Sequence, residues 1–266
     1  MKILILPPYH NKNGYTLQQT HELMENLEKK GQIAKDEYVI VKGSFIDWLQ
    51  ERRGFEFLAV INLGVIEKVR EYSQSGGIDA IVCLGSLDPA FFPAREISDI
   101  PYMAALHPAL HVASLLGDKC SVIESVDSSA IIARRNAKVY GFDEKLVSAR
   151  HVGYSSTYMG KFLNDYPKED RTSVPEIKTI IRDIVDQCVG AIEQDRADSV
   201  ILSCMPLQVF EDEVREGLNS AGYSDVPLIC ELSAAVAMAK AVVNMNLTHT
   251  RLVYPREDTK LKYTVR

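Results

Sequence analysis

The sequence predicts an α/β protein of two pseudo-symmetric lobes, each a short parallel sheet flanked by helices, with an active site in the cleft between them. Short apolar runs alternate with amphipathic segments, which is the pattern of parallel strands joined by helical crossovers. The run at residues 79–85 matches the run at residues 198–204 position by position, with Gly85 where Cys204 stands. Each run precedes an Asp-x-Pro segment that opens another strand, at residues 99–101 and 225–227. A unit of strand, helix, strand and helix therefore occurs twice.

The individual elements follow from apolar periodicity and from the turn residues between the runs. Strands are predicted at residues 2–6, 38–41, 79–85, 101–105, 120–123, 146–152, 198–204 and 228–230. Helices are predicted at residues 16–30, 56–72, 89–97, 108–116, 128–140, 174–195 and 232–243, and an apolar stripe predicts one more helix through Leu207, Phe210, Val214 and Leu218. Residues 154–173 are expected to form a long loop, a lid or a lobe connector.

The repeat also predicts how the chain divides between the lobes. The first lobe is expected to contain residues 1–112 and 222–266, and the second lobe residues 113–221. A cleft between two such lobes would receive strand ends from both sides, and open α/β sheets bind their ligands at the carboxyl ends of the strands.

Composition excludes several functional classes. A net charge of −6 without a basic cluster argues against a nucleic-acid partner. The chain shows no transmembrane run and no signal peptide, so we expect a cytoplasmic protein with no membrane partner. Five irregularly spaced cysteines indicate free thiols in a reducing compartment. Phosphate-binding loops and metal-ligand spacings with a third ligand are absent from the sequence, and we expect no cofactor and no metal.

Cys204 is the first candidate for chemistry. Its strand ends at Met205-Pro206, and Pro206 can open the following helix. A thiol at a helix N-terminus is placed to become a thiolate, the reactive form of cysteine. The alternative is that Cys204 only fills the core, because cysteine is among the most buried residue types.

Three further residues occupy strand-to-helix corners, where ligands bind. At Gly85 and Ser86, backbone N–H groups and the Ser86 hydroxyl can approach a carboxylate or an oxyanion, although Gly85 can also serve only as a turn residue. His107 occupies the equivalent corner of a neighbouring strand and can line the pocket. His111, four residues later, is expected to be structural or to face solvent, and Cys83 to be a packing residue.

Several segments together resemble the hydantoin racemases and place the chain in the aspartate/glutamate/hydantoin racemase superfamily. The matching segments are residues 79–89, Ala94-Arg95-Glu96, Ile100-Pro101, residues 111–117, Tyr140-Gly141 and Leu202-Ser203-Cys204. The resemblance covers roughly residues 50–245. It implies two α/β lobes, no cofactor, and a pair of cysteines acting on opposite faces of a substrate α-carbon.

The departures from the family pattern affect the expected mechanism. The first catalytic cysteine of the family falls on Gly85. The asparagine-proline-asparagine segment after the first strand is replaced by Pro7-Pro8-Tyr9, and the threonine pair after the fifth strand by Glu124-Ser125. A glycine at the first position, a retained second cysteine and a proline pair after the first strand are similar to arylmalonate decarboxylase, although Leu87 stands where that enzyme has a second polar residue.

With one thiol visible, the first hypothesis is a cofactor-independent decarboxylase or isomerase acting at the carbon next to a carboxyl or carbonyl group of a small acid. The catalytic candidates are Cys204 and His107. The candidates for substrate binding are Pro8, Tyr9, Gly85, Ser86, Glu124, Ser125 and Met205. The substrate is expected to be a small carboxylate or a cyclic ureide, and the protein can form a homo-oligomer. Two alternatives stay open, an amino-acid or hydantoin racemase with His107 or Cys83 as the second base, and a non-catalytic small-molecule sensor.

Overall fold

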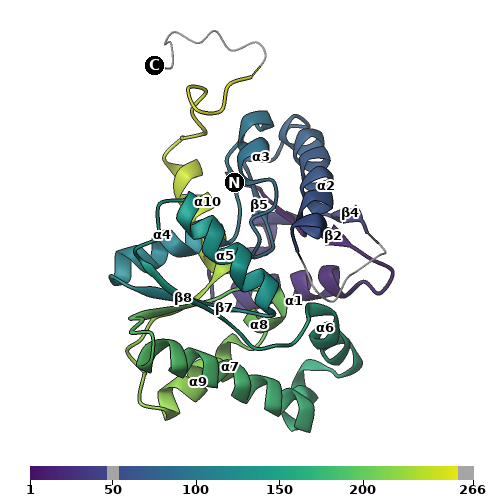
Figure 1. The fold of residues 1–266 in the computed structure, drawn as a ribbon. Helices are drawn as coiled ribbons and strands as arrows, with labels where there is room; N and C mark the ends of the chain where they lie inside the picture. The colour runs from purple at the N-terminus through teal and green to yellow at the C-terminus, as the bar shows by residue number, and fades with distance from the viewer. Residues whose placement is uncertain (47–53, 257–266) are drawn as a thin grey trace.

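The computed structural model describes residues 1–46 and 54–256, and it shows two α/β lobes that meet along a common face (Figure 1). The predicted fold class is confirmed. Within the described residues, the strands are β1 (Ile3–Leu6), β2 (Tyr9–His10), β3 (Tyr38–Ile40), β4 (Ser44–Phe45), β5 (Ala80–Cys83), β6 (Tyr102–Met103), β7 (Cys120–Glu124), β8 (Leu146–His151), β9 (Ser199–Leu202) and β10 (Leu228–Cys230). All eight predicted strands are therefore present; only the two-residue strands β2 and β4 were missed.

The two main sheets have the same topology, which is the structural basis of the sequence repeat. The first sheet has the order β3-β1-β5-β6 and the second β8-β7-β9-β10, and all neighbours within each are parallel. In each sheet the first strand along the chain, β1 or β7, lies next to the edge strand. Its other neighbour is the third strand along the chain, β5 or β9. Strands β5 and β9 therefore occupy equivalent positions, and Gly85 and Cys204 follow them at equivalent points.

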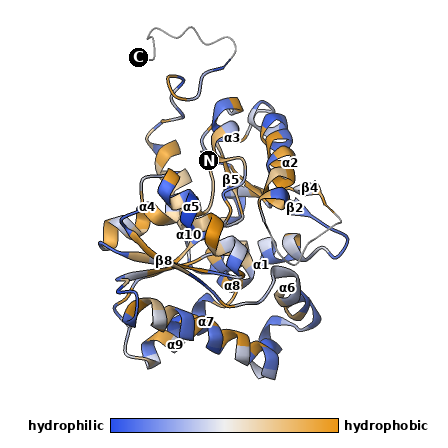
Figure 2. Ribbon diagram, in the orientation of Figure 1, coloured by the Kyte–Doolittle hydropathy of each residue, from blue (hydrophilic) through white to orange (hydrophobic). Residues whose placement is uncertain are grey.

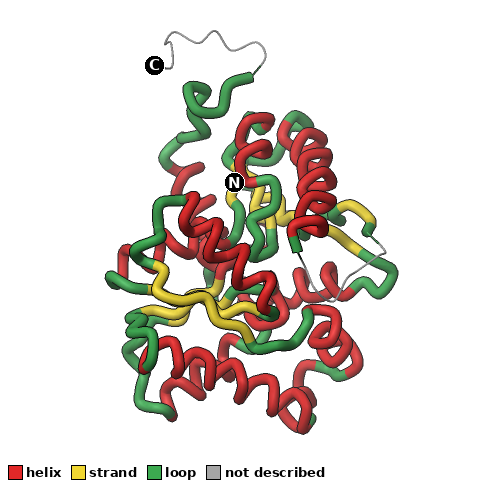
Figure 3. The backbone as a smooth tube through the Cα atoms, in the orientation of Figure 1, coloured by secondary structure: helices red, strands yellow, loops and turns green. Residues whose placement is uncertain are grey.

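Helices cover both faces of the sheets (Figure 3). The described helices are α1 (Tyr15–Lys29), α2 (Phe55–Ser73), α3 (Phe91–Ile97), α4 (Leu106–Leu116), α5 (Asp127–Val139), α6 (Ser156–Asp165), α7 (Pro175–Glu193), α8 (Met205–Gln208), α9 (Glu211–Ser220) and α10 (Glu231–Asn244), with 3-10 turns at Lys35–Glu37 and Lys168–Ser173. Figure 2 shows hydrophobic and hydrophilic residues on the same helices, as expected of helices with one buried face. None of the described helices is both long enough and apolar enough to cross a membrane.

Two helices are exchanged between the lobes. Helix α4 follows the first sheet in the chain but packs against β9 and β10 of the second sheet, whereas α10 follows β10 and packs against β5 and β6. The predicted lobe boundaries need correction for this reason. Strand β10 was expected in the first lobe but pairs with β9, so the chain changes lobe near Ala104 and again at Cys230. Residues 257–266, also expected in the first lobe, lie outside the described residues.

Two helical predictions were wrong. The segment 154–173 was expected to be a loop, yet it forms α6 and a 3-10 turn. Met159 and Leu163 of α6 are buried one turn apart, and the Ser155 hydroxyl caps the helix by accepting a hydrogen bond from the Tyr158 amide. The helix expected through residues 207–218 is divided into α8 and α9.

The lobes share one hydrophobic core. A single buried cluster includes Ile3 and Val82 of the first sheet together with Val200 and Leu202 of the second. The segment that follows α6 is also fixed to the first lobe, because the largely buried Arg171 forms an ion pair with Glu22 of α1 at 2.5 Å. A shared core and a largely buried ion pair therefore join the two lobes.

Candidate active site

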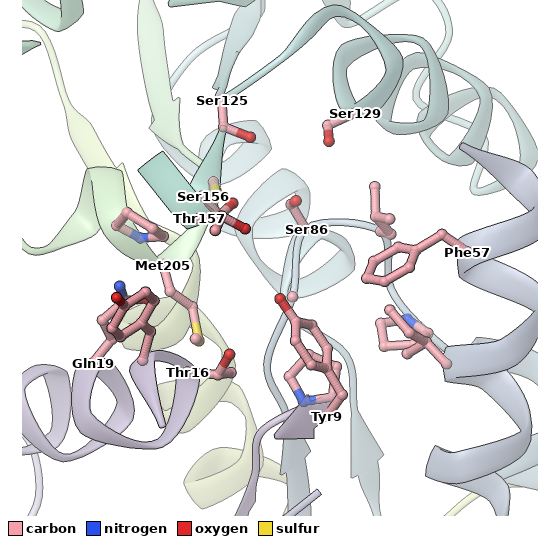
Figure 4. A pocket seen from close by; sticks show the side chains of 18 of the residues that line it. Tyr9, Thr16, Gln19, Phe57, Ser86, Ser125, Ser129, Ser156, Thr157 and Met205 are labelled. Carbon is pink, nitrogen blue, oxygen red and sulfur yellow. Dashed lines mark hydrogen bonds between the residues drawn. The ribbon is translucent and has the colours of Figure 1, made fainter. Parts of the chain in front are cut away.

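The carboxyl ends of strands from both sheets converge on one cavity (Figure 4). The first lobe contributes Pro8 and Tyr9 after β1 and Gly85 and Ser86 after β5; the second contributes Ser125 after β7 and Cys204 and Met205 after β9. Seven of the nine residues proposed from the sequence therefore lie around a single space. Additional lining residues come from α1, α2, α5, α6 and α8 and from the loops after β2 and β5, namely Asn11, Tyr15, Thr16, Gln19, Phe57, Leu58, Ile61, Leu87, Pro89, Ser129, Ser156, Thr157 and Pro206.

Cys204 has an unusual backbone conformation. Its φ of 51° and ψ of 120° are rarely adopted by a residue with a side chain. Such strain costs about 1–3 kcal/mol and is concentrated at functional sites. The Cys204 Sγ lies 3.1 Å from the Oγ of Ser156, the first residue of α6, and Cys204 as a whole is 7 % exposed. The site thus contains a strained, nearly buried thiol in contact with a hydroxyl group.

Gly85 occupies the equivalent place on the first lobe, and its φ of 111° favours glycine. The register of β1 with β5 brings the segments that follow them together, so a Cβ at Gly85 would lie 3.3 Å from the Pro8 Cγ. The cavity wall at this point is formed by backbone and by a proline ring. No thiol faces Cys204 from this position.

Beneath Ser86 lies a cluster of buried oxygen atoms that reaches from one lobe to the other. The Ser86 hydroxyl donates to Glu124 Oε2 at 3.3 Å. The Ser203 Oγ lies 2.7 Å from Glu124 Oε1 and 2.5 Å from Glu231 Oε1. Burial, and secondly the charge of Glu124, raise the pKa of Glu231 well above its usual value. Glu124 is fully buried and is not among the described residues that line the cavity, so its expected contact with substrate is replaced by a contact with Ser86.

His107 lies outside the cavity. Its ring packs against Phe91, Tyr140 and His111, and burial lowers the pKa of His107 to about 3. Its amide donates to Asp88 Oδ2 at 3.0 Å, and burial raises the pKa of Asp88 to about 7. His107 is the second residue of α4, which packs on the second sheet, and this exchange directs the residue away from the cleft. His107 is not among the described residues that line the cavity, so the structure does not support the catalytic role expected for it.

His107 and His111 form a close pair outside the cavity. The Nε2 atoms of His107 and His111 lie 3.3 Å apart, but no three His, Cys, Asp or Glu residues in the described part of the chain are grouped so as to hold a metal.

Sequence reasoning missed Ser156 and Thr157 because it assigned no helix to their segment. The capping Ser155 and the spacing of Met159 and Leu163 were the signals that could have revealed it.

Two facing parallel sheets that bring a thiol and several hydroxyl groups to one cavity define a two-lobed α/β protein with its site at the strand ends. The chain belongs to the Asp/Glu/Hydantoin racemase family, whose model matches residues 56–239. The hydantoin racemase of Pseudomonas sp. (strain NS671) is 23% identical over 200 residues, which are 75% of this chain and 72% of that protein.

Solved structures show the same fold. The allantoin racemase from Pseudomonas fluorescens superimposes with a TM-score of 0.75 at 20% identity, and the match covers 98% of both chains. Unliganded arylmalonate decarboxylase superimposes with a TM-score of 0.54 at 15% identity, covering 91% of this chain and 92% of that one. The fold is thus shared with an allantoin racemase and with a decarboxylase.

Proposed function

We propose that this protein catalyses cofactor-independent proton transfer at the carbon next to a carbonyl group of a small cyclic ureide, with Cys204 as an acid–base group. The observation that carries the proposal is the Cys204 thiol at the cavity wall, in contact with Ser156 and held in a strained conformation. A base within reach of the α-carbon and hydroxyl donors for the developing oxyanion are the two requirements of enolate formation.

The lining of the cavity supports a substrate of this class. The Ser125 and Ser129 hydroxyls lie on one side and those of Tyr9 and Thr16 on the other, with the Gln19 amide near Thr16 (Figure 4). The described lining residues include neither Arg, Lys nor His. A neutral ring with alternating C=O and N–H groups can form hydrogen bonds with such hydroxyl and amide groups. A dicarboxylate would find no cationic side chain among the described lining residues to balance its charge, so the lining favours the neutral ring. The hydantoin and allantoin racemases named above act, by name, on cyclic ureides.

Hydrogen–deuterium exchange provides the test. Separate enantiomers of allantoin and of 5-methylhydantoin are incubated with the protein in heavy water, and the deuterium content and configuration of the recovered compound are measured. Cys204→Ala should lower exchange of at least one enantiomer at least about 100-fold, the smaller of the effects usual for a lost acid–base group. Cys188→Ala, which removes a buried thiol from α7, is the matched control. Exchange of both enantiomers by Cys204→Ala within a few-fold of wild type would exclude Cys204 from the reaction.

Decarboxylation is the second candidate, and the absence of a side chain at Gly85 favours it. One proton donor is sufficient to protonate the carbanion left by loss of CO2, so a single thiol could complete that reaction. The measurement is CO2 release from 2-methyl-2-phenylmalonate, with allantoin exchange measured in parallel. Release of CO2 without exchange on either ureide would select the decarboxylase.

A further inference from the structure

The geometry points to Ser86, acting with Glu124 behind it, as a second acid–base group that works with Cys204 on the same substrate carbon. The assignment rests on the function proposed above for Cys204. Ser86 lines the cavity and follows Gly85, the position equivalent to Cys204 in the other lobe. Its hydroxyl is therefore at the corner from which a second proton-transfer group would act.

Proton counting within the buried cluster shows how Glu124 is charged. The Ser203 hydroxyl has one proton but lies within hydrogen-bond distance of both Glu124 and Glu231. One of the two contacts must therefore be donated by a carboxyl group. Glu231 holds that proton, because burial and the charge of Glu124 raise its pKa, and because its second carboxyl oxygen is buried without a hydrogen-bond partner. An unpartnered oxygen costs less on a neutral acid than on a carboxylate.

It follows that Glu124 is the carboxylate of the pair. Glu231 donates to Ser203, and Ser203 donates to Glu124 Oε1. Glu124 Oε2 accepts from the Ser86 hydroxyl and from the Ser125 amide, each at 3.3 Å. Hydrogen bonds donated to an ionised carboxylate favour that form and fix its orientation. Glu124 is thus held as a base directly behind the hydroxyl that lines the cavity.

This arrangement permits a balanced proton transfer. As the substrate C–H bond breaks, the Ser86 Oγ takes the proton and releases its own to Glu124 Oε2, which becomes neutral. The electron pair of the C–H bond passes into the enolate. The Cys204 thiol then donates its proton to the opposite face of the carbon, and the product has the inverted configuration. One proton leaves the carbon and one arrives in each turnover, which leaves Cys204 as a thiolate and Glu124 neutral. This form performs the reverse sequence on the other enantiomer, or returns to the starting form when Glu124 releases a proton to solvent and Cys204 takes one up.

Ser86 is the catalytic residue of the pair, since it borders the cavity, and Glu124 acts through it. A hydroxyl is a weak base by itself, and an adjacent base in hydrogen-bond contact is the usual means of activating one. The sequence places this pair where a second thiol is missing. We therefore expect the enzyme to invert configuration with one thiol and one carboxylate-backed hydroxyl.

The test separates the two enantiomers of 5-methylhydantoin. In a two-base reaction each enantiomer presents its proton to one group only. Ser86→Ala and Glu124→Gln should each slow deuterium exchange of one enantiomer at least about 100-fold, while exchange of the other, through Cys204, stays within about 10-fold of wild type. Cys204→Ala should show the opposite selectivity. Ser121→Ala is the matched control, because it removes a buried serine hydroxyl of β7 that bonds to Ser148 instead.

The outcomes distinguish this inference from the function on which it rests. If Ser86→Ala slows both enantiomers equally, or neither, the hydroxyl is not a second base, and the role of Cys204 stands. If Cys204→Ala leaves both enantiomers at the wild-type rate, the proposed function fails. If the wild-type protein exchanges neither enantiomer, both fail. Glu124→Gln keeps the side-chain volume and so carries the test even if Ser86→Ala does not fold.

Discussion

Replacing Cys204 by glycine or by alanine should reverse the usual order of stability of these two residues. Both variants lose the sulfur atom and its contact with Ser156, so these losses cancel in the comparison. The two differ only by a methyl group on a backbone with φ 51° and ψ 120°. A methyl group in this region is strained, whereas glycine adopts it freely.

The size of the difference follows from two opposing effects. The strained conformation costs a residue with a Cβ about 1–3 kcal/mol. Glycine costs about 0.5–1 kcal/mol relative to alanine, since it loses more backbone freedom on folding. Subtraction leaves Cys204→Gly more stable than Cys204→Ala by about 0–2.5 kcal/mol. Each kcal/mol corresponds to about 2–4 °C in Tm for a chain of this size.

Urea denaturation at pH 7 measures the difference, with exchange of 5-methylhydantoin followed on the same samples. Both variants should lose exchange of the enantiomer whose proton Cys204 removes, so the thiol and the strain would be shown to belong to one position. Cys188 in α7 provides the control pair, where Gly should be less stable than Ala by about 0.8–1.0 kcal/mol, as usual in a helix. A Cys204→Gly variant less stable than Cys204→Ala by about 0.5 kcal/mol or more would refute the strain.

Two further predictions concern the neighbouring corners. Burial lowers the pKa of His107 to about 3, so the folded state prefers the neutral ring. The contribution of neutral His107 to the stability of the fold is therefore full above the unfolded pKa near 6.5 and is lost as the pH falls towards 3. In His107→Phe, the free energy of unfolding should therefore fall less between pH 7 and pH 4.5 than in the wild type, by at most about 2.7 kcal/mol, and deuterium exchange should be unchanged. A urea midpoint with the same pH dependence in the variant and the wild type would contradict this. Gly85→Cys should restore inversion to Ser86→Ala by placing a thiol at the end of β5, at a cost in stability of about 1–3 kcal/mol from its positive φ. A folded double variant that exchanges without inversion would show that position 85 does not face the reacting carbon.

The parts of the fold that depend on local patterns could be predicted from the sequence. Apolar runs bounded by turn residues located all eight strands of the two sheets, and the repeat of residues 79–85 at 198–204 predicted that Gly85 and Cys204 would meet at one cleft. A strand end needs no distant information to be placed in this way, because parallel sheets direct their carboxyl ends to the same edge.

Features that depend on packing between the lobes could not be predicted. The boundary at residue 112 followed the order of the elements, but α4 buries its apolar face on the opposite sheet, which no local pattern reveals. His107 was expected at the cavity because it follows a strand of the first sheet, and the packing of α4 on the second sheet could not be foreseen. The cluster of Glu124, Ser203 and Glu231 also depends on long-range contacts. Ser203 is 79 positions from Glu124 and 28 positions from Glu231 in the sequence. The sequence marked Glu124 as unusual but did not show that it would lie behind Ser86.

The exchange of α4 and α10 gives the chain the organisation of a domain-swapped dimer joined into one polypeptide. Each half of the repeat provides a helix to cover the sheet of the other half, and α4 and α10 pack against each other where the halves meet. A half expressed separately would lack the helix that covers one face of its own sheet, and would expose that apolar face to water. Only when both halves are present are the two sheets closed, and the cavity between them is then formed in the same event as the fold.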